Sequence, residues 1–178
     1  MRPAVLLGAF AGLRLAEAAA LRFDVDFMRG IVHPAIQYPA EPLKSDTAMT
    51  AIPIPPELAL MLSAEGARTR AEVLVTNEIM RPSTPWVIER AMRHGRASVR
   101  GLPQGFRFHD LRHYFPSLLI AAGLDVKIVQ ARLRHASAMT TRNTDGRLWP
   151  DSDESSRAAV AVALAAREDK SRTTEVSN

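Results

Sequence analysis

Three segments carry the residue types that phosphoryl-transfer chemistry needs. Phe108-His-Asp-Leu-Arg-His113 is followed by Arg134-His-Ala-Ser137 and then by Asn143-Thr-Asp-Gly-Arg-Leu-Trp149. The first two segments could bring two histidines and an arginine to one phosphate. An arginine fork binds two phosphate oxygens while an imidazole beside it gives or takes a proton. The third segment is where we expect a nucleophile, and Asp145 stands there.

The first segment lies at the start of a helix that the apolar spacing predicts over residues 109–122. His109 and Arg112 are three residues apart, so we expect them to be neighbours on one face of this helix. That face lies opposite an apolar stripe of Leu111, Phe115, Leu118, Leu119 and Ala122. The alternative for each polar residue, taken singly, is a surface role at the helix N-terminus. His135 and Lys44, each taken alone, favour structural roles.

A helix expected from Pro3 to Leu21 must position Arg14, which has Glu17 three residues further on. A buried Arg–Glu pair is one interpretation, and an arginine pointing at a ligand anion is the other. The apolar run in this segment resembles a secretory signal but is interrupted by both charges, so we favour a buried helix. Its abrupt start suggests a fragment of something longer.

Composition predicts one globular domain. The chain has 178 residues, of which 47% are hydrophobic and 24% charged, enough for one core. We place the domain at residues 1–167 and expect residues 168–178 to be a disordered tail. The absence of cysteine excludes disulfides and cysteine-ligated zinc and is typical of a reducing cytoplasm. The longest apolar run is too short to span a membrane.

Positive charge is concentrated in one part of the chain. The formal net charge is +4, and six arginines but only one acid, Asp110, fall between Arg90 and Arg112. Such a block attracts polyanions. A solvated basic face is the alternative.

Periodicity and turn residues predict a mainly helical α+β fold. A hairpin over 22–27 and 31–38 and an edge strand at 51–55 would form a small antiparallel, three-stranded sheet. Residues 72–76 are expected to be extended, and 101–105 to be a loop. Further helices are expected at 56–64, from Ser83/Thr84-Pro85 to about Arg96, from Asp125 to Leu133 and from about Asp153 to Ala166.

The order Arg14, Lys44, His109-x-x-Arg112, His135 resembles the catalytic domain of the tyrosine recombinases, the phage integrase family. Ala11-Gly-Leu-Arg-Leu-x-Glu17 is similar to the family's first arginine box. Phe108-His-Asp-Leu-Arg-His-Tyr-Phe115 with Leu133-Arg-His-Ala-Ser137 is similar to its second. Lys44 precedes the strand at 51–55, as the family's β-hairpin lysine does. The resemblance covers nearly the whole chain.

The resemblance implies a transesterification on double-stranded DNA, without metal, cofactor, membrane or small-molecule substrate. Arg14 and Arg112 would clamp the non-bridging phosphate oxygens, Lys44 would protonate the leaving 5′ oxygen, and His109 would assist proton transfer. His135 would hydrogen-bond a phosphate oxygen. The resemblance also allows self-association on DNA through the C-terminal helix. Backbone contacts would come from Arg90, Arg93, Arg96, Arg100 and Arg107.

The departures from the family pattern predict a site that no longer cuts DNA. Relatives carry Thr-Tyr-Gly-His where this chain has Thr144-Asp-Gly-Arg147, so Asp145 replaces the nucleophilic tyrosine. Pro116 falls inside the 109–122 helix and removes a backbone bond to the Arg112 carbonyl, at a cost of about 3 kcal/mol. Arg134 replaces a usual glycine, a milder departure. The N-terminal domain with which these enzymes encircle DNA is expected to be missing.

The sequence therefore favours an inactive tyrosine-recombinase catalytic domain, with two alternatives. One is a non-catalytic DNA-binding protein that keeps the positive surface. The other is a zinc hydrolase, because His109 and His113 have the i, i+4 spacing of zinc-binding helices. Such motifs use a glutamate as the base, and Arg112 would place a cation beside the metal.

Overall fold

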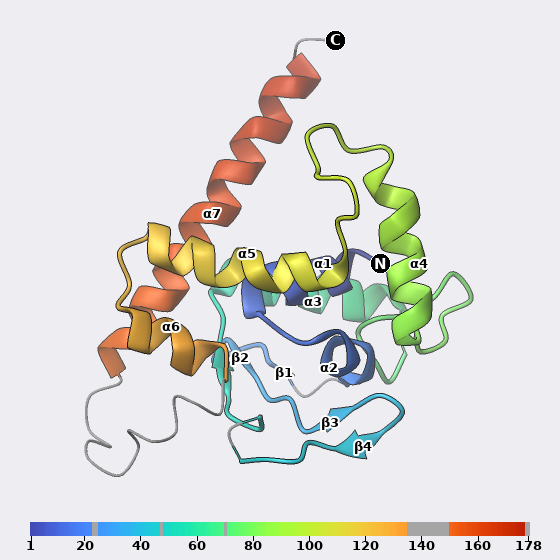
Figure 1. Cartoon of the computed structure of the whole chain (residues 1–178), viewed down its shortest axis with the longest axis horizontal. Helices are drawn as coiled ribbons and strands as arrows, with labels where there is room; N and C mark the ends of the chain where they lie inside the picture. Colours follow the sequence, from blue (N-terminus) through green and yellow to red (C-terminus); the bar gives the residue numbers. More distant parts are fainter. Residues whose placement is uncertain (23–24, 47, 70, 135–149, 177–178) are drawn as a thin grey trace.

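The computed structural model describes residues 1–22, 25–46, 48–69, 71–134 and 150–176, and it is mainly helical with a small antiparallel sheet (Figure 1). The predicted α+β class is confirmed. The helices are α1 (Arg2–Ala11), α2 (Leu15–Ala20), α3 (Pro56–Thr69), α4 (Pro85–Arg96), α5 (Phe108–Ala121), α6 (Val126–Arg132) and α7 (Pro150–Val176). The strands are β1 (Val25–Asp26), β2 (Ile31–Val32), β3 (Ile36–Gln37), β4 (Glu41–Pro42) and β5 (Ile52–Pro53).

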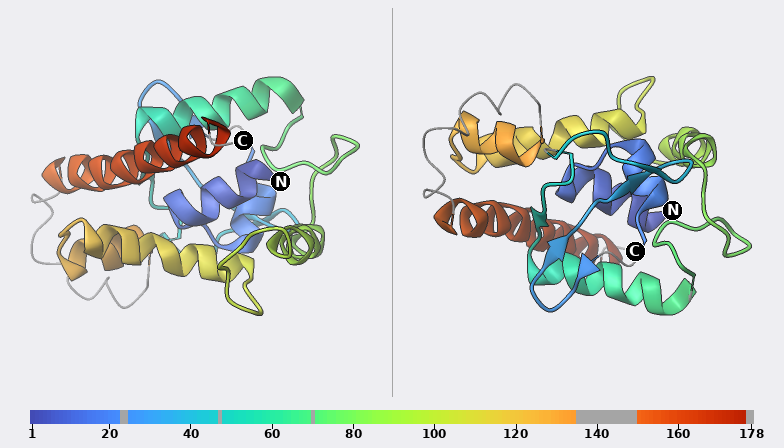
Figure 2. Two further views of the ribbon diagram at one scale, coloured as in Figure 1. Left: turned by 90° about the horizontal axis from the view of Figure 1, so that it is seen from above. Right: turned by 90° about the horizontal axis from the view of Figure 1, so that it is seen from below.

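Helix α1 is the centre of the core. It lies between α5 on one side and α3 and α7 on the other (Figure 2). Eight of its ten residues are buried, which is expected for a helix that is apolar all round. Phe108 and Phe115 of α5 pack into the same core. Burial of each such side chain contributes about 1.5–3 kcal/mol.

The single N-terminal helix predicted from Pro3 to Leu21 is wrong, because the chain breaks into α1 and α2 at Gly12. Gly12 caps α1 in the left-handed conformation, with φ 62°. A Cβ atom at this position would lie 2.6 Å from Cδ1 of Phe115. Glycine therefore lets α5 pack close to the break and frees the following residues to change direction.

The three-stranded sheet has the order β1-β2-β5 with antiparallel pairs, as predicted, but its strands are short. Pro53 lies on the edge strand, where a missing N–H is tolerated. The predicted second hairpin strand at 31–38 is divided, because Ile36–Gln37 pairs with Glu41–Pro42 in a separate two-stranded sheet. The predicted extended segment at 72–76 makes only isolated bridges, through Val73 and Thr76.

Two helix starts confirm the capping predictions. The Thr84 hydroxyl accepts a hydrogen bond from the Val87 N–H at 3.3 Å, ahead of Pro85 at the start of α4. The Asp125 carboxylate accepts from the Lys127 N–H at 2.8 Å at the start of α6. In both cases a side-chain oxygen satisfies an otherwise unpaired N–H of the first turn.

Helix α5 continues through Pro116, and the hydroxyl of Ser117 donates to the His113 carbonyl at 3.1 Å. Its predicted apolar stripe is buried except for Ala122, which caps the helix and is exposed. Helix α3 is longer than predicted, and so is α7. Because α7 runs to Val176, most of the tail expected to be disordered is helical.

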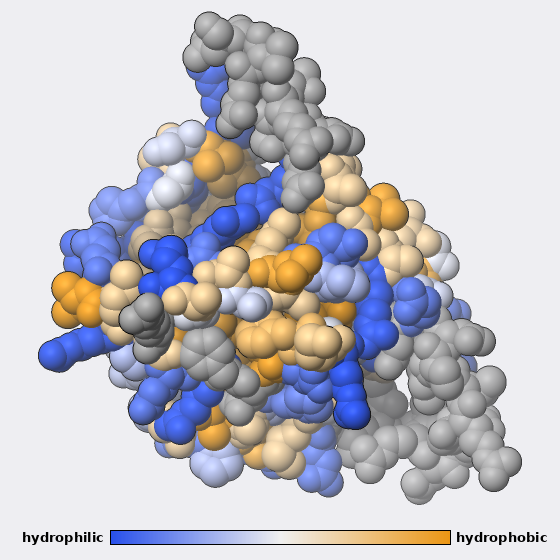
Figure 3. Space-filling model, turned by 180° about the vertical axis from the view of Figure 1, so that it is seen from behind, coloured by the Kyte–Doolittle hydropathy of each residue, from blue (hydrophilic) through white to orange (hydrophobic). Residues whose placement is uncertain are grey.

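The face opposite to that of Figure 1 gathers hydrophobic surface toward its middle, with hydrophilic residues around it (Figure 3). Exposed Leu60 of α3 and Val162 of α7 are among the apolar side chains of the surface. Over the described residues, none of the helices is long and apolar enough to cross a bilayer.

Candidate functional site

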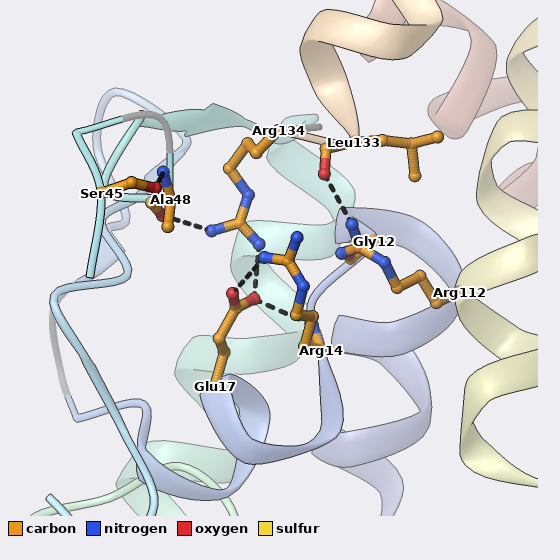
Figure 4. Close-up of polar contacts among 8 residues, drawn as sticks. All are labelled: Gly12, Arg14, Glu17, Ser45, Ala48, Arg112, Leu133 and Arg134. Carbon is orange, nitrogen blue, oxygen red and sulfur yellow. Dashed lines mark hydrogen bonds and ion pairs between the residues drawn. The ribbon is translucent and has the colours of Figure 1, made fainter. Parts of the chain in front are cut away.

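Three arginines from distant parts of the sequence lie in one group, and two of them, Arg14 and Arg134, bind the same carboxylate (Figure 4). Arg14 comes from the break between α1 and α2, Arg112 from α5, and Arg134 from the residues after α6. The carboxylate is that of Glu17, in α2. We call these four residues the arginine cluster. Glu17, Arg112 and Arg134 are 1%, 4% and 2% exposed.

Arg14 and Glu17 are joined by the start of α2. Glu17 accepts from the Arg14 N–H at 2.9 Å and from its Nη1 at 2.9 Å. The predicted Arg–Glu pair is confirmed, although only Glu17 is buried and the Arg14 side chain is 44% exposed. The alternative that Arg14 faces a ligand anion stays a prediction.

Arg112 lies within the buried stripe of α5, so the prediction that it lies opposite that stripe is wrong. The helical period aligns it with Phe108, Phe115 and Leu119, which are also buried. Its guanidinium donates to the carbonyl of Gly12 and, at 2.6 Å, to that of Leu133. Burial, and secondarily the charges of Arg14 and Arg134, lower the pKa of Arg112 to about 10. It remains a cation at neutral pH.

Arg134 lies at the middle of the cluster, although the sequence suggested only a mild departure there. Its Nη2 donates to Glu17 Oε2 at 2.5 Å, and its Nη1 donates to the Ala48 carbonyl at 2.6 Å. Its backbone is left-handed, with φ 55°. A left-handed residue after a helix is usually glycine. An arginine in place of the usual glycine was therefore the one feature of the sequence that marked this position as unusual.

The electrostatics of the cluster favour the ionised state of Glu17. Burial acts to raise the pKa of Glu17, but Arg134 and the hydrogen bonds from Arg14 outweigh it, and the net result is a pKa below the ordinary value. Burial also lowers the pKa of Arg134, against the opposing effect of Glu17. The cluster therefore holds three cations and one carboxylate, and such an excess of positive charge favours a nearby anion.

The structure does not bring every predicted residue to the cluster. Lys44 is exposed and follows β4, close in sequence to Ala48. His109 is exposed, and its ring contacts that of His113 edge to face, with centroids 4.4 Å apart. The hydrogen bonds of Arg112 within the described residues go to backbone carbonyls and not to His109. His135 and Asp145 lie outside the described residues.

The second arginine group follows α4 and the loop to α5. We call Arg90, Arg93, Arg96, Arg100 and Arg107 the arginine strip. Four of them are exposed, and Arg96 is partly buried, with a bond from Nη1 to the Phe106 carbonyl at 3.1 Å. The Arg90 guanidinium lies over the ring of Trp86, 5.6 Å from its centroid. The strip presents cations to solvent, and its contact with the DNA backbone stays a prediction.

The geometry does not support the alternative that His109 and His113 bind zinc. Among the described residues, no group of three or more histidine, cysteine, aspartate or glutamate side chains could hold a metal ion. His109 and His113 contact each other through their rings instead. The pair therefore lacks a third ligand within the part of the chain that the structure describes.

Comparison with known proteins gives concordant results. The model of the phage integrase family matches residues 2–144. Tyrosine recombinase XerC of Rhizobium meliloti (strain 1021) is 31% identical over 144 residues, which are 74% of this chain and 40% of the relative. XerC of Rhodospirillum centenum (strain ATCC 51521 / SW) is 46% identical over 63 residues, 35% of this chain and 18% of the relative. The chain thus spans less than half the length of these relatives.

Solved structures share the fold. The Tn1549 transposon integrase in complex with transposon right end DNA matches with a TM-score of 0.65 and 20% identity, over 89% of this chain and 58% of that one. XerA recombinase matches with a TM-score of 0.61 and 22% identity, over 82% and 52%.

Proposed function

The chain belongs to the phage integrase family, and on that premise we propose that it binds double-stranded DNA as a tyrosine-recombinase catalytic domain. We propose residues 1–167 as this domain. One observation carries the proposal: the guanidinium groups of Arg14 and Arg134 bind the one buried carboxylate of the cluster, that of Glu17. The charge of Arg112 acts on the same group of residues, which leaves an excess of positive charge for a backbone phosphate. The lack of cysteine fits action in the cytoplasm.

Arg14 and Arg112 are the proposed phosphate clamp. The Arg14 side chain is partly exposed, so it can meet a phosphate without rearranging the core. Arg112 donates one hydrogen bond to the Gly12 carbonyl and one to the Leu133 carbonyl. A guanidinium has five N–H donors, so three are left unused by the described residues and could bind phosphate oxygens. The carbonyl bonds fix the plane of the group before DNA arrives, which favours tight recognition.

The remaining roles rest on the family pattern and on position. Lys44, exposed after β4, would protonate the leaving 5′ oxygen, and His109 would assist proton transfer. His135 would hydrogen-bond a phosphate oxygen. The arginine strip would contact the DNA backbone without reading sequence.

We propose that the bound phosphate is not cleaved, because Asp145 replaces the attacking tyrosine. Cleavage needs a nucleophile that bonds to phosphorus while the 5′ oxygen leaves with a proton. A carboxylate is repelled by the phosphodiester, is shorter than a phenol, and would give a labile acyl phosphate. The domain would therefore hold DNA without forming a lasting covalent link.

A binding assay and a trapping assay together test this function. We expect a mobility shift with duplex DNA that weakens steeply with salt, and no covalent adduct on a nicked suicide substrate. Arg14→Ala is expected to weaken binding, while Glu154→Gln, an exposed change far along the chain, is the control. A trapped adduct would refute the inactivity, and the lack of any shift at low salt would refute DNA binding.

Restoring the nucleophile tests whether the rest of the site is intact. Asp145→Tyr with Arg147→His, joined to a core-binding domain of a relative, should recover some cleavage. Because α5 is continuous through Pro116, we expect Pro116→Ala to add little to this recovery. Adduct formation on the suicide substrate is the measurement, and Asp145→Phe in the same background is the control.

Self-association on DNA through α7 is a further part of the proposal. The C-terminal part of α7 projects away from the body of the protein (Figure 1). A helix placed in this way is available to a neighbouring molecule. Analytical ultracentrifugation on a duplex with two binding sites tests this association. A chain that ends at residue 167 should form fewer paired complexes on this duplex than the full chain does.

A further inference from the structure

Arg134 has a buried charge and a left-handed backbone, and both features cost free energy that other contacts must offset. Its side chain is almost fully buried, so the guanidinium loses its hydration. Its φ of 55° is in the left-handed region, which L side chains avoid. Backbone strain at a buried charge points to a local role.

The contacts of Arg134 join three separate segments. Nη2 donates to Glu17, 117 residues away in the sequence, and Nη1 donates to the Ala48 carbonyl, 86 residues away. The Arg134 backbone itself ends α6, with its N–H donating to the Ala131 carbonyl at 3.0 Å. One side chain therefore connects α2, the end of α6 and the turn after β4 (Figure 4).

The turn that Arg134 holds begins one residue after Lys44. The Ala48 N–H donates to the Ser45 carbonyl at 2.9 Å and to the Ser45 hydroxyl at 3.2 Å. The Met49 N–H donates to the same carbonyl at 3.3 Å and to that of Asp46 at 3.2 Å. Because these bonds close the turn on itself, fixing Ala48 also fixes Ser45 and hence the backbone of Lys44.

We propose that Arg134 is a positioning residue that ties the turn of Ser45, Asp46, Ala48 and Met49 to the arginine cluster and so fixes the backbone that follows Lys44. Only a forked donor suits this task, because Glu17 and the Ala48 carbonyl must be bound by different nitrogens at once. A lysine offers a single nitrogen. The meaning of this contact for DNA rests on the proposed function, in which Lys44 approaches the phosphate that Arg14 and Arg112 hold.

Hydrogen exchange in the DNA-free full chain tests the contact itself. Arg134→Gly removes the guanidinium and leaves a residue that adopts a left-handed backbone without strain. The Ala48 and Met49 amides should then exchange at least about tenfold faster, relative to α1 amides, since the turn no longer has a hydrogen bond from a charged group. Arg134→Lys should give an intermediate rate. Unchanged exchange in both variants overturns the proposal.

Two further measures keep this test decisive. Arg68→Ala breaks the ion pair between the exposed Arg68 and the buried Glu65, in α3, and should leave the turn amides unchanged. If Arg134→Gly does not fold, Arg134→Lys carries the test, because it keeps a cation beside Glu17 but cannot place donors at the two separate positions of Nη1 and Nη2, so its bond to Ala48 should be weaker. If the Ala48 and Met49 amides of Arg134→Lys then exchange as slowly as in the unaltered chain, the proposal is wrong.

DNA binding tests the consequence for Lys44. Lys44→Ala should reduce the slope of log affinity against log salt by about 0.9 in the unaltered chain, and by clearly less in Arg134→Gly. Equal reductions in both backgrounds would show that Lys44 does not depend on Arg134. If the unaltered chain binds no DNA, the proposed function fails, while the exchange result still decides whether Arg134 holds the turn.

Discussion

The arginine cluster and the arginine strip use the same side chain in opposite settings. In the cluster, Arg112 and Arg134 are buried, and each donates to two fixed acceptors. In the strip, Arg93, Arg100 and Arg107 are exposed. A buried guanidinium has a fixed direction and an altered pKa, whereas an exposed one keeps its water and its freedom. In the proposed function, this difference would separate a site that orients one phosphate from a surface that attracts many.

The largest effect is expected where the single carboxylate of the cluster is neutralised. Glu17→Gln leaves three cations together without a counter-charge, and breaking a buried pair costs about 3–5 kcal/mol of unfolding free energy. The control is Glu154→Gln, since Glu154 is 79% exposed and lies 3.9 Å from Arg157. We expect about 0–1 kcal/mol there. Urea unfolding of both variants measures the contrast, and equal losses would contradict it.

The same substitution, glycine to alanine, can be made beside the cluster and beside the strip to compare how tightly the two backbones are packed. Gly12→Ala places a Cβ at φ 62° and 2.6 Å from the Phe115 ring, beside a carbonyl that Arg112 uses. We expect a loss of about 2 kcal/mol or more. Gly95→Ala lies in α4 beside the strip, with nothing within 4 Å of the added Cβ. It should gain about 0.5–1 kcal/mol from helix propensity. Thermal unfolding measures both, and a neutral Gly12→Ala would contradict the close packing.

The cluster should also respond to acid in a way that the strip does not. The pKa of Glu17 in the folded chain lies below its ordinary value of 4.5, so the folded state binds fewer protons than the unfolded state in this range. The stabilisation is therefore complete above about pH 4.5 and is lost as the pH falls through the folded value. The stability difference between the unaltered chain and Glu17→Gln should shrink accordingly. A constant difference from about pH 6 down to acid unfolding would count against the ion pairs.

The smallest effects on stability are expected in the strip, where the effect on DNA should be visible instead. Arg93→Ala and Arg100→Ala should each change the unfolding free energy by less than about 0.5 kcal/mol. Each should reduce the salt slope of DNA binding by about 0.9 for every phosphate that the arginine neutralises. Fluorescence anisotropy over a salt series measures the slope. A stability loss as large as that of Glu17→Gln would remove the distinction between the two regions.

Sequence reasoning succeeded where a local signal was sufficient. Thr84 before Pro85 and Asp125 after Gly123 marked two helix starts, because a cap needs only residues within one turn. The pairing of Arg14 with Glu17 is equally local. Periodicity located α5, yet it misplaced Arg112, because a charged residue was assumed to face away from the apolar stripe.

Other features could not be predicted locally. The break at Gly12 follows from the approach of Phe115, which lies far along the chain. Arg134 finds Glu17 and Ala48 only when α2, α6 and the turn after β4 come together. The sequence showed only that Arg134 stands where a glycine is usual, and this departure indicated neither its left-handed backbone nor its partners.

Motifs and periodicity are local patterns, and they were enough to indicate the family, the mainly helical class and most of the residues that we propose as phosphate contacts. Comparison of the motifs also showed that Asp145 stands where the family pattern has a tyrosine. The folded arrangement was needed to establish which arginines are buried, which carbonyls hold them, and that Arg134 shares the carboxylate with Arg14. Burial and ion pairing depend on segments up to 117 residues apart, and their energies arise only after packing has excluded water.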